Sequence, residues 1–336
     1  MGRKTVNWKG KRVLVTGGGG FIGSHLVERL VVLGADTRAL VHYRSDGSWG
    51  WLDNASTNNS TGSFEVIAGD IRDRDSVNTA MRDREIVFHL AALIGIPFSY
   101  HAPMSYIQTN IEGTTNLLLA ARDGAPDMVV HTSTSEVYGS ARYVPMDEGH
   151  PLQGQSPYSA SKIGADKIAE AFHASFGVPV ATARPFNTYG PRQSARAVIP
   201  TIIMQALTEP QIILGSLDPI RDFNYVLDTV DGFIRIAEHP EAAGQVFNLG
   251  PEDPISIRDL AQKILALIGR GNIPIVSQYE RVRPDESEVD RLHADSSKAR
   301  AQLDWTPGHT LEGGLAETIE WIRANLDIYR AGTYAV

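Results

Sequence analysis

The first 190 residues alternate between short apolar runs and amphipathic segments, and this alternation constrains the fold more than any other feature. Six runs predict strands: RVLV (12–15), DTRALVHY (36–43), FEVIAGDI (64–71), EIVFHLAAL (85–93), DMVVHTST (127–134) and PVATARPFN (179–187). Helical patterns lie between them, among them SVNTAMRD, NIEGTTNLLLAARD and YSASKIGADKIAEAFHASFG. Such alternation predicts an α/β fold with a doubly wound parallel sheet.

A glycine-rich turn, TGGGGFIG (16–23), stands between the first predicted strand and the first predicted helix. Gly17 suits a tight turn, Gly20 lets the backbone approach a pyrophosphate, and Gly23 permits close packing of helix on strand. The pyrophosphate would rest on the N-terminus of the helix, at Phe21 and Ile22, where free N–H groups and the helix dipole favour an anion. In this strand–turn–helix context the pattern predicts a dinucleotide-binding site.

The identity of the dinucleotide depends on the ends of the following strands. NAD enzymes usually place an acid after the second strand to hold the ribose 2′-hydroxyl, and LVHYRS contains none. Arg44 would accept a 2′-phosphate, which favours NADP, unless it is only a solvated arginine. Asp70, followed by Ile71, is a candidate acceptor for the adenine amino group or else a helix N-cap. The end of the fourth strand includes small side chains that leave room for a cofactor, and its residues are Leu90, Ala91 and Ala92.

Tyr158 and Lys162 are four residues apart in YSASKIGADK, so they share one face of a predicted helix. A free tyrosine has a pKa of about 10 and is a poor base at neutral pH. A nearby ammonium and a positively charged nicotinamide ring would stabilise the phenolate and lower that pKa. The pair therefore predicts proton removal from a hydroxyl whose carbon gives up a hydride.

Composition excludes several other classes of protein. The chain has 336 residues with a net charge of −8 and no basic block, which argues against nucleic acid or an anionic membrane as the partner. It has no cysteine, and its histidines show no paired ligand spacing, so we expect no metal site. The N-terminus lacks the apolar region of a signal peptide, and no apolar run is long enough to cross a membrane. We expect a cytoplasmic enzyme.

Taken together, TGGGGFIG, GDI, HLAAL, YSASK, RPFNTYGPR and RDFNYVLD make the chain resemble the extended short-chain dehydrogenase/reductase family over nearly its whole length. The resemblance implies a Rossmann domain over residues 1–190, with a returning segment around 222–250. It also implies a smaller, discontinuous α/β domain over 191–336 that holds a nucleotide-sugar. Short stretches of sequence such as LVHYRSDGSWGWLD resemble those of nucleotide-sugar 4,6-dehydratases of the legionaminic-acid-pathway type. The cofactor, NAD or NADP, would stay tightly bound and be regenerated at each turnover.

The family's activities differ in what accompanies Tyr158 and Lys162. All members first oxidise the sugar C4 hydroxyl to a ketone. A 4,6-dehydratase must also remove the C5 proton and expel the C6 hydroxyl, a task suited to a carboxylate held over C5. Thr134, Ser135 and Glu136 match the family's Thr-Ser-Glu form of this site. The resemblance implies that Glu136 is the C5 base and proton relay, that Thr134 hydrogen-bonds the C4 oxygen, and that Ser135 orients the C6 hydroxyl.

Other functions remain open at this point. A UDP-glucuronate decarboxylase would need a cation for the substrate carboxylate, and Arg192 and Arg196 are candidates. A 4-epimerase, including a UDP-glucuronate 4-epimerase, would need no base at position 136. Glu136 could also form only a salt bridge within its loop. A non-catalytic NAD(P)-sensing protein is disfavoured because the catalytic set is intact.

The resemblance also implies how the substrate is held and how the chain assembles. Asn187 resembles the family residue that contacts the sugar diphosphate. Arg221 and Arg283 look like the two arginines that clamp the nucleotide and its phosphates, a role suited to bidentate donors. Arg192 is a further candidate for substrate binding. The two helical patterns at 110–123 and 158–177 are expected to form the interface of a homodimer.

Overall fold

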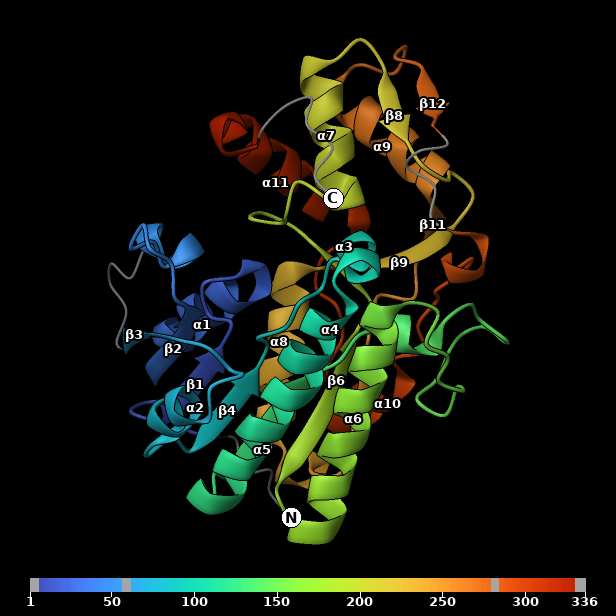
Figure 1. The fold of residues 1–336 in the computed structure, drawn as a ribbon. Helices are drawn as coiled ribbons and strands as arrows, with labels where there is room; N and C mark the ends of the chain where they lie inside the picture. Colours follow the sequence, from blue (N-terminus) through green and yellow to red (C-terminus); the bar gives the residue numbers. More distant parts are fainter. Residues whose placement is uncertain (1–5, 56–61, 279–283, 330–336) are drawn as a thin grey trace.

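The computed structural model describes residues 6–55, 62–278 and 284–329. Its centre is a seven-stranded sheet with the order β10-β6-β5-β4-β1-β2-β3, in which every neighbouring pair is parallel (Figure 1). The chain leaves β1 toward β2 and β3 on one side and toward β4, β5 and β6 on the other. The point where the strand order reverses therefore lies between β1 and β4, which is where doubly wound sheets bind ligands. The predicted Rossmann-type α/β fold is confirmed.

The described residues contain these strands: β1 Arg12–Thr16, β2 Asp36–His42, β3 Ser63–Gly69, β4 Ile86–His89, β5 Met128–Thr132, β6 Val180–Pro185, β7 Asn187–Tyr189, β8 Ile212–Leu214, β9 Ile220–Tyr225, β10 Val246–Leu249, β11 Pro254–Ser256 and β12 Ile275–Ser277. The α-helices are α1 Phe21–Val32, α2 Arg74–Met81, α3 Ile96–His101, α4 Pro103–Tyr106, α5 Gly113–Gly124, α6 Pro157–Phe176, α7 Val198–Thr208, α8 Val226–Glu238, α9 Ile257–Ile268, α10 Ser297–Leu303 and α11 Leu311–Ala324.

Helices cover both faces of the large sheet, and this is why central strands such as β1 and β4 are largely apolar. In β1, Val13 and Val15 point into a core formed with α1, α8 and α10, whereas Leu14 points into a core formed with α2, α5 and α6. Side chains of a strand alternate between its two faces, so a strand that is buried on both sides needs apolar residues at every position. In Figure 1 α5 and α6 lie side by side in front of the sheet, and α8 lies behind it.

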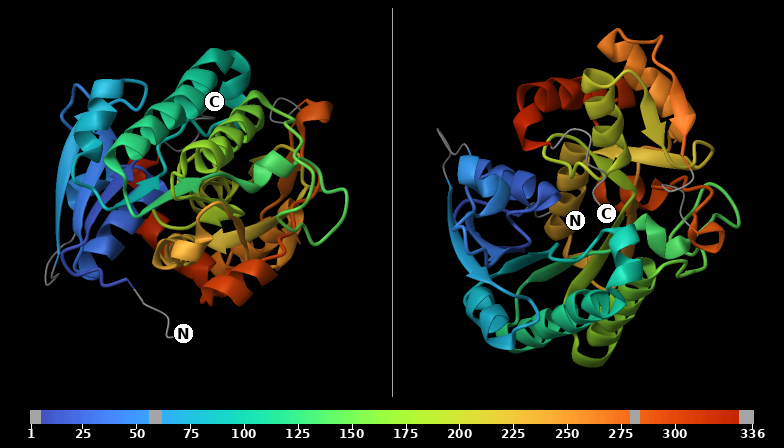
Figure 2. Two further views of the ribbon diagram at one scale, coloured as in Figure 1. Left: turned by 90° about the horizontal axis from the view of Figure 1, so that it is seen from below. Right: turned by 45° about the horizontal axis from the view of Figure 1, so that its top comes forward.

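A second core lies at one end of the sheet and comes mostly from the C-terminal half of the chain (Figure 2). It packs α7, α9 and α11 with a three-stranded sheet, β11-β9-β7, and a two-stranded sheet, β12-β8. Residues 226–249 return to the large sheet, because α8 packs on α1 and β10 pairs with β6. We keep the division into two domains near residue 190 as a proposal.

Two predicted segments differ in detail from the structure. The helix expected over 110–123 starts as a wide π-type turn over Ile107–Glu112 and continues as α5. The strand expected over 64–71 runs instead over Ser63–Gly69 as β3. Within the described part of the chain, no helix is both long enough and apolar enough to span a bilayer.

Candidate active site

The glycine turn joins β1 to α1 at the point where the strand order reverses. Gly17 has a φ of +71°, and a side chain there would lie 2.9 Å from the Ala91 backbone nitrogen, so the position requires glycine. The N–H groups of Leu90 and Ala91 each donate to Thr16 Oγ1 at 3.1 Å, which ties the ends of β1 and β4 together. Ala92 follows and is partly exposed. The turn and the end of β4 thus form one crevice.

The N-terminus of α1 is free to bind an anion. Gly20 is its N-cap and offers no side-chain hydrogen bond, and the first turn carries no acidic residue. The N–H groups of that turn, which includes Phe21 and Ile22, need an acceptor from outside the helix. Ile22 also packs against both hydrophobic cores, so it holds this turn between the two parts of the molecule. The arrangement fits a dinucleotide pyrophosphate.

Farther from the turn, two predicted cofactor residues are engaged by neighbours. Arg44 follows β2, and its Nη2 forms an ion pair with Asp46 at 2.7 Å. Because Arg44 is paired with Asp46, its presence no longer favours NADP over NAD. Asp70 follows β3 and accepts two hydrogen bonds from the Arg72 Nε at 3.0 Å, and these contacts lower the pKa of Asp70. Asp70 is not the N-cap of α2, since Asp73 fills that position.

Ile71 contributes to the crevice through its backbone alone. Its side chain is buried in the core under α2 and α5. A side chain on Gly113 would meet that of Ile71 at 2.7 Å, so the glycine at the start of α5 is needed for this packing. The Ile71 carbonyl accepts a hydrogen bond from Asn116 Nδ2 at 3.1 Å.

The predicted catalytic residues come together from two elements. Thr134 and the buried Ser135 and Glu136 follow β5, where Thr134 caps a short 3₁₀ turn over Ser135–Tyr138, and its hydroxyl accepts from the Glu136 N–H at 3.2 Å. We call this segment the 135–138 turn. Tyr158 and Lys162 lie on α6, and the side chains of Tyr158 and Thr134 are hydrogen-bonded. The structure therefore brings together the hydroxyl, carboxylate, phenol and ammonium that the sequence predicted.

The start of α6 is fixed by its own sequence. Ser156 and Ser159 form a capping box, in which each side chain accepts from the backbone N–H of the other residue at about 3 Å. Pro157 occupies the first helical position, where a missing N–H costs nothing. Tyr158 is thus held one residue inside a well-defined helix terminus.

The electrostatics of the pair differ from the expectation. Burial, together with the charge of Glu136, raises the pKa of Tyr158 in the protein alone, although the bond from Thr134 opposes the shift. Burial also lowers the pKa of Lys162 to about 8, and the Lys162 ammonium donates to the Thr132 carbonyl at 2.5 Å. Lys162 alone therefore does not make the phenol a base, and a further positive charge is required.

Sequence reasoning missed a buried polar network beneath these residues. Asn110 accepts from the Leu93 N–H and donates to both the Leu93 carbonyl and the Ser161 hydroxyl, each at 2.9 Å. Ser161 in turn donates to the Tyr158 carbonyl at 2.7 Å. Tyr106 packs edge-on against the Tyr158 ring, with the centroids 6.3 Å apart. Helical spacing could have placed Ser161 near Tyr158, but no local signal predicts Asn110 or Tyr106.

The predicted substrate residues divide into three cases. The Asn187 Oδ1 is buried and has no hydrogen-bond partner within the described residues, so it is available to a ligand. Arg192 is bound to α1, where it donates to Glu28 at 2.9 Å and to Ser24 at 3.1 Å, and its assignment to substrate stays a prediction. Arg221 is buried and paired with Glu288 at 3.1 Å. Arg283 lies outside the described residues.

A tryptophan-rich loop covers the glycine turn. The Trp51 N–H donates to the Gly19 carbonyl at 3.0 Å, and a side chain on Gly50 would collide with that carbonyl. The Trp51 ring packs edge-on against Trp321 of α11, with the centroids 5.4 Å apart. The loop is therefore a packed connection between the dinucleotide turn and the second core.

A glycine turn at the strand-order reversal and a Tyr–Lys pair on a buried helix define a dinucleotide-dependent enzyme of the short-chain dehydrogenase/reductase class. The family model for GDP-mannose 4,6 dehydratase matches residues 14–318. The chain belongs to this family of NAD-dependent extended short-chain dehydrogenase/reductase enzymes that act on nucleotide-sugars.

Curated relatives of similar closeness carry different activities. A UDP-glucose 4-epimerase from Mycolicibacterium smegmatis is 34% identical over 93% of this chain and 98% of its own length. A UDP-N-acetyl-alpha-D-glucosaminuronate decarboxylase from Bacillus cytotoxicus is 32% identical over 93% and 98%. A dTDP-glucose 4,6-dehydratase from Actinoplanes sp. is 33% identical over 94% and 98%.

Solved structures agree with the fold. A dTDP-glucose 4,6-dehydratase from Streptomyces venezuelae, solved with NAD bound, superposes with a TM-score of 0.83 at 29% identity, over 95% of this chain and 99% of that one. The comparisons therefore establish the family, while the choice among its reactions depends on the site.

Proposed function

We propose that the protein is a nucleotide-sugar 4,6-dehydratase with NAD as its cofactor. The observation that carries this proposal is the buried carboxylate of Glu136, which lies two residues after Thr134 in the turn that meets Tyr158. A reaction confined to C4 has no use for a buried acid here, and burying an ionisable group without a function is costly. Support for NAD comes from the anion-binding glycine turn, from the pairing of Arg44 with Asp46, and from the related structure with NAD.

Oxidation at C4 uses the shared part of the site. NAD held at the glycine turn would supply the acceptor for the C4 hydride and the donor of hydride to C6. Tyr158 accepts the proton of the C4 hydroxyl, and Thr134 holds that oxygen through its hydroxyl. Because burial raises the pKa of Tyr158, the phenolate depends on the positive charge of Lys162 together with that of the oxidised nicotinamide.

Elimination uses Glu136. The C4 ketone acidifies the C5 hydrogen, Glu136 removes it, and the C5–C6 double bond forms as the C6–oxygen bond breaks. The same carboxyl group gives its proton to the departing oxygen, which leaves as water, and Ser135 orients that hydroxyl. Hydride then adds to C6 and a proton from an exchangeable group adds to C5. The product is a 4-keto-6-deoxy sugar nucleotide, and the cofactor returns to its oxidised form.

Substrate binding is proposed to involve Asn187 and Arg221. The orphan oxygen of Asn187 can accept a hydrogen bond from the substrate. Arg221 lies near the end of the same small sheet, where a diphosphate would compete with Glu288 for its guanidinium. The assignment of Arg283 as a second phosphate clamp remains part of this proposal.

Two other reactions start from the same C4 ketone. A 4-epimerase would turn the ketone over and return hydride to C4, in line with the 34% identical epimerase. A decarboxylase needs a cation beside the substrate carboxylate. Arg192 is not available for this because it is bound to Glu28. Arg196 is exposed, and its Nη1 would lie 3.2 Å from a Cβ atom added to Gly95. Arg196 is therefore the residue that keeps decarboxylation as the second candidate.

We also propose that the protein is a homodimer. The helices α5 and α6 pack side by side on the outer face of the sheet (Figure 1). Leu119 of α5 and Ile168 of α6 pack against the core beneath these helices and are only partly buried. Pairing two copies through these helices would bury this face in a four-helix bundle. Sedimentation analysis would test it.

Mass spectrometry of reactions with UDP-GlcNAc, GDP-GlcNAc, dTDP-glucose and UDP-glucuronate, each tested separately, decides among these functions. A dehydratase will release one water from a hexose substrate, and in deuterated water the product will carry one deuterium at C5, because the original C5 proton leaves with the water. Glu136→Gln will abolish this product. Loss of carbon dioxide from UDP-glucuronate would assign a decarboxylase, and an unchanged mass with an inverted C4 would assign an epimerase.

The matched control is Glu170→Gln. Glu170 is exposed on α6 and pairs with Lys167 at 2.6 Å, so the same chemical change is made outside the site. This variant should retain full activity. Tyr158→Phe should abolish every reaction that starts with C4 oxidation, whichever product the protein makes.

A further inference from the structure

A buried ion pair lies directly behind the catalytic residues, and the reaction described above does not use it. Asp166 follows Lys162 by one helical turn on α6 and is 4% exposed. Its carboxylate accepts hydrogen bonds from the Arg184 Nε at 3.2 Å and Nη2 at 3.0 Å, from the Ser133 hydroxyl at 2.8 Å, and from His131 Nε2 at 3.2 Å. Both carboxylate oxygens of Asp166 are therefore hydrogen-bonded. Their partners lie on β5, directly after β5 and on β6, and these elements flank the site.

Arg184 continues this connection to the 135–138 turn. Its Nη1 donates to the Tyr138 hydroxyl at 3.0 Å, and its guanidinium stacks 5.0 Å from the centre of the Tyr138 ring. Tyr138, which is the last residue of the turn, donates to Asn248 Oδ1 of β10 at 2.7 Å. Asp166, Arg184 and Tyr138 thus link the helix that carries Tyr158 to the turn that carries Glu136.

We propose that Asp166 is a positioning residue that holds the 135–138 turn against α6 through Arg184 and provides the buried counter-charge of Lys162. The inference rests on the proposed function in one respect, that Glu136 and Lys162 act in the same reaction. In this proposal Asp166 contacts neither substrate nor cofactor. It acts through Glu136 and Lys162, which do.

The charges around Lys162 explain why a counter-charge is needed. Burial lowers the pKa of Lys162, and Asp166 is the acid that opposes this effect. His89 of β4 and His131 of β5 face the same region, and burial lowers the pKa of both, so they are neutral and contribute no positive charge at neutral pH. Arg184 of β6 pairs with Asp166 and with Tyr138, and the pKa of Lys162 responds to Asp166 rather than to Arg184. Without Asp166 the ammonium would face cationic and neutral groups only, apart from Glu136.

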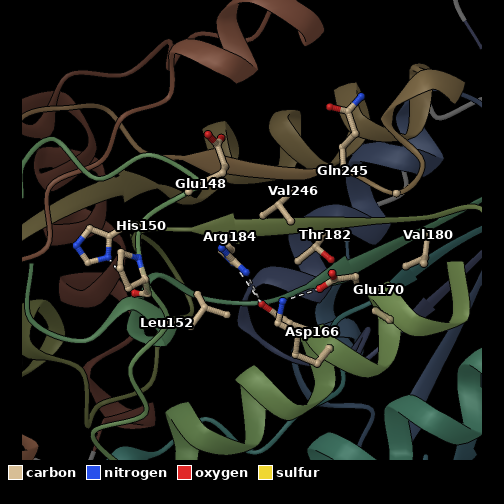
Figure 3. Close-up of a pocket in the computed structure, with 15 residues that line it drawn as sticks. Glu148, His150, Leu152, Asp166, Glu170, Val180, Thr182, Arg184, Gln245 and Val246 are labelled. Atoms are coloured by element: carbon tan, nitrogen blue, oxygen red, sulfur yellow. Dashed lines mark hydrogen bonds and ion pairs between the residues drawn. The ribbon is translucent and has the colours of Figure 1, made fainter. Parts of the chain in front are cut away.

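A cavity of about 430 Å³ opens on the far side of this ion pair (Figure 3). Figure 3 shows Asp166 of α6 and Arg184 of β6 facing each other at its floor, beside Thr182 and Glu170. None of the proposed catalytic residues lines it. The Asp166–Arg184 pair therefore borders a cavity that the catalytic residues do not line.

The direct test observes Lys162 without any substrate. The chain has seven lysines, so the NMR spectrum of protein labelled with ¹³C at the lysine ε-carbon is simple, and Lys162→Arg assigns the signal. In the NAD-loaded wild type, we expect Lys162 to titrate well below an ordinary lysine, because burial lowers its pKa. In Asp166→Asn the midpoint should fall by about 1 unit or more, as expected for the loss of a close opposite charge.

Kinetics provide the second readout. At the pH where Lys162 is half protonated in the wild type, a midpoint lower by about 1 unit leaves about one tenth protonated, so kcat should fall roughly fivefold there with little change in KM, and the alkaline limb should move to lower pH. Tyr138→Phe, which removes the hydroxyl that joins the turn to Arg184 and to Asn248 but leaves Asp166 in place, should lower kcat without moving that limb. Glu170→Gln, one turn farther along α6, should change neither property.

Asp166→Asn leaves Arg184 buried without its partner and can unfold the protein for that reason alone. The double variant Asp166→Asn/Arg184→Met removes both charges at similar volume and should fold. It should still show the lowered Lys162 midpoint. A wild-type midpoint in this double variant would overturn the counter-charge role, and a wild-type kcat in Tyr138→Phe would overturn the role in holding the turn.

The two proposals fail in different ways. If the protein proves to be an epimerase or a decarboxylase, the Lys162 titration in Asp166→Asn still shifts, since that measurement uses no substrate. If the dehydratase is confirmed and the titration is unchanged, the inference about Asp166 alone is refuted.

Discussion

Replacing Gly23 by alanine tests the geometry of the dinucleotide turn directly. A side chain at Gly23 would meet the Gly17 carbonyl oxygen head-on, with the Gly17 carbonyl carbon at 2.9 Å and the Gly18 Cα at 3.0 Å. All three atoms belong to backbone, so none can rotate away. The Gly17 carbonyl also accepts the N–H of Gly20 at 3.0 Å, and moving it therefore moves the turn that the pyrophosphate would occupy.

Two opposing effects set the expected stability change. Alanine is favoured over glycine inside a helix by about 0.5–1 kcal/mol. Overpacking of a tight site costs about 1–3 kcal/mol, and here the contact is with backbone rather than with a flexible side chain. We expect Gly23→Ala to lower the free energy of unfolding by about 1–2 kcal/mol. Because the turn must shift, we also expect the affinity for NAD to fall by about tenfold or more, which corresponds to about 1.4 kcal/mol of binding free energy.

Urea unfolding of the apoprotein and calorimetric titration with NAD measure the two effects separately. The control is Gly271→Ala, because an added side chain there meets no atom within 4 Å. This control should have wild-type affinity for NAD and equal or slightly higher stability. If Gly23→Ala binds NAD as tightly as the wild type does, the turn can absorb the side chain, and our account of why glycine is required at this position is wrong.

Two further predictions concern distant parts of the fold. Trp321→Ala removes the ring that packs on Trp51, so it should lower the free energy of unfolding by about 0.5–1.5 kcal/mol beyond the lost apolar contact. It should also weaken NAD binding, because the Trp51 loop is hydrogen-bonded to Gly19. Trp321→Phe should keep most of the stability and most of the NAD affinity, and fluorescence-monitored unfolding and NAD titration check these expectations. Burial raises the pKa of Asp222 to about 6 from 3.8, so its contribution to stability is full below about pH 4 and is lost as the pH rises through about 6. The stability of the wild type relative to Asp222→Asn should therefore fall by up to about 3 kcal/mol between about pH 4 and pH 7 in urea unfolding, and a constant difference would contradict the raised pKa.

The parts of the site that were predictable from sequence are those fixed by local geometry. The glycine spacing around Gly17 and Gly20 specifies a turn between a strand and a helix, and the structure has that turn. The four-residue spacing of Tyr158 and Lys162 places both on one face of α6, since a helix repeats every 3.6 residues. Apolar runs of four to nine residues likewise predicted six strands of the large sheet, and the signal is clearest for central strands such as β1, β4 and β5, which are buried on both faces.

The parts that sequence reasoning could not supply depend on partners far along the chain. Arg192 is paired with Glu28, 164 residues away, and nothing in the local pattern of either residue predicts the pairing. Arg221 is paired with Glu288, 67 residues away. Local patterns indicate that an arginine stands at the end of a strand, but only the fold determines which carboxylate it meets.

Asp166 shows where the two kinds of information meet. Its spacing from Lys162 places it on the same face of α6, which the sequence allows one to predict. Its importance becomes visible only when β5, β6 and the 135–138 turn bring His131, Arg184 and Tyr138 to it. In the proposed reaction the C4 ketone is the branch point, and Glu136 held over C5 would favour elimination over simple return of hydride. A link that fixes this turn to the helix therefore acts at the step that separates the dehydratase from its relatives, and the position of the turn, more than the presence of the carboxylate alone, should determine which product forms.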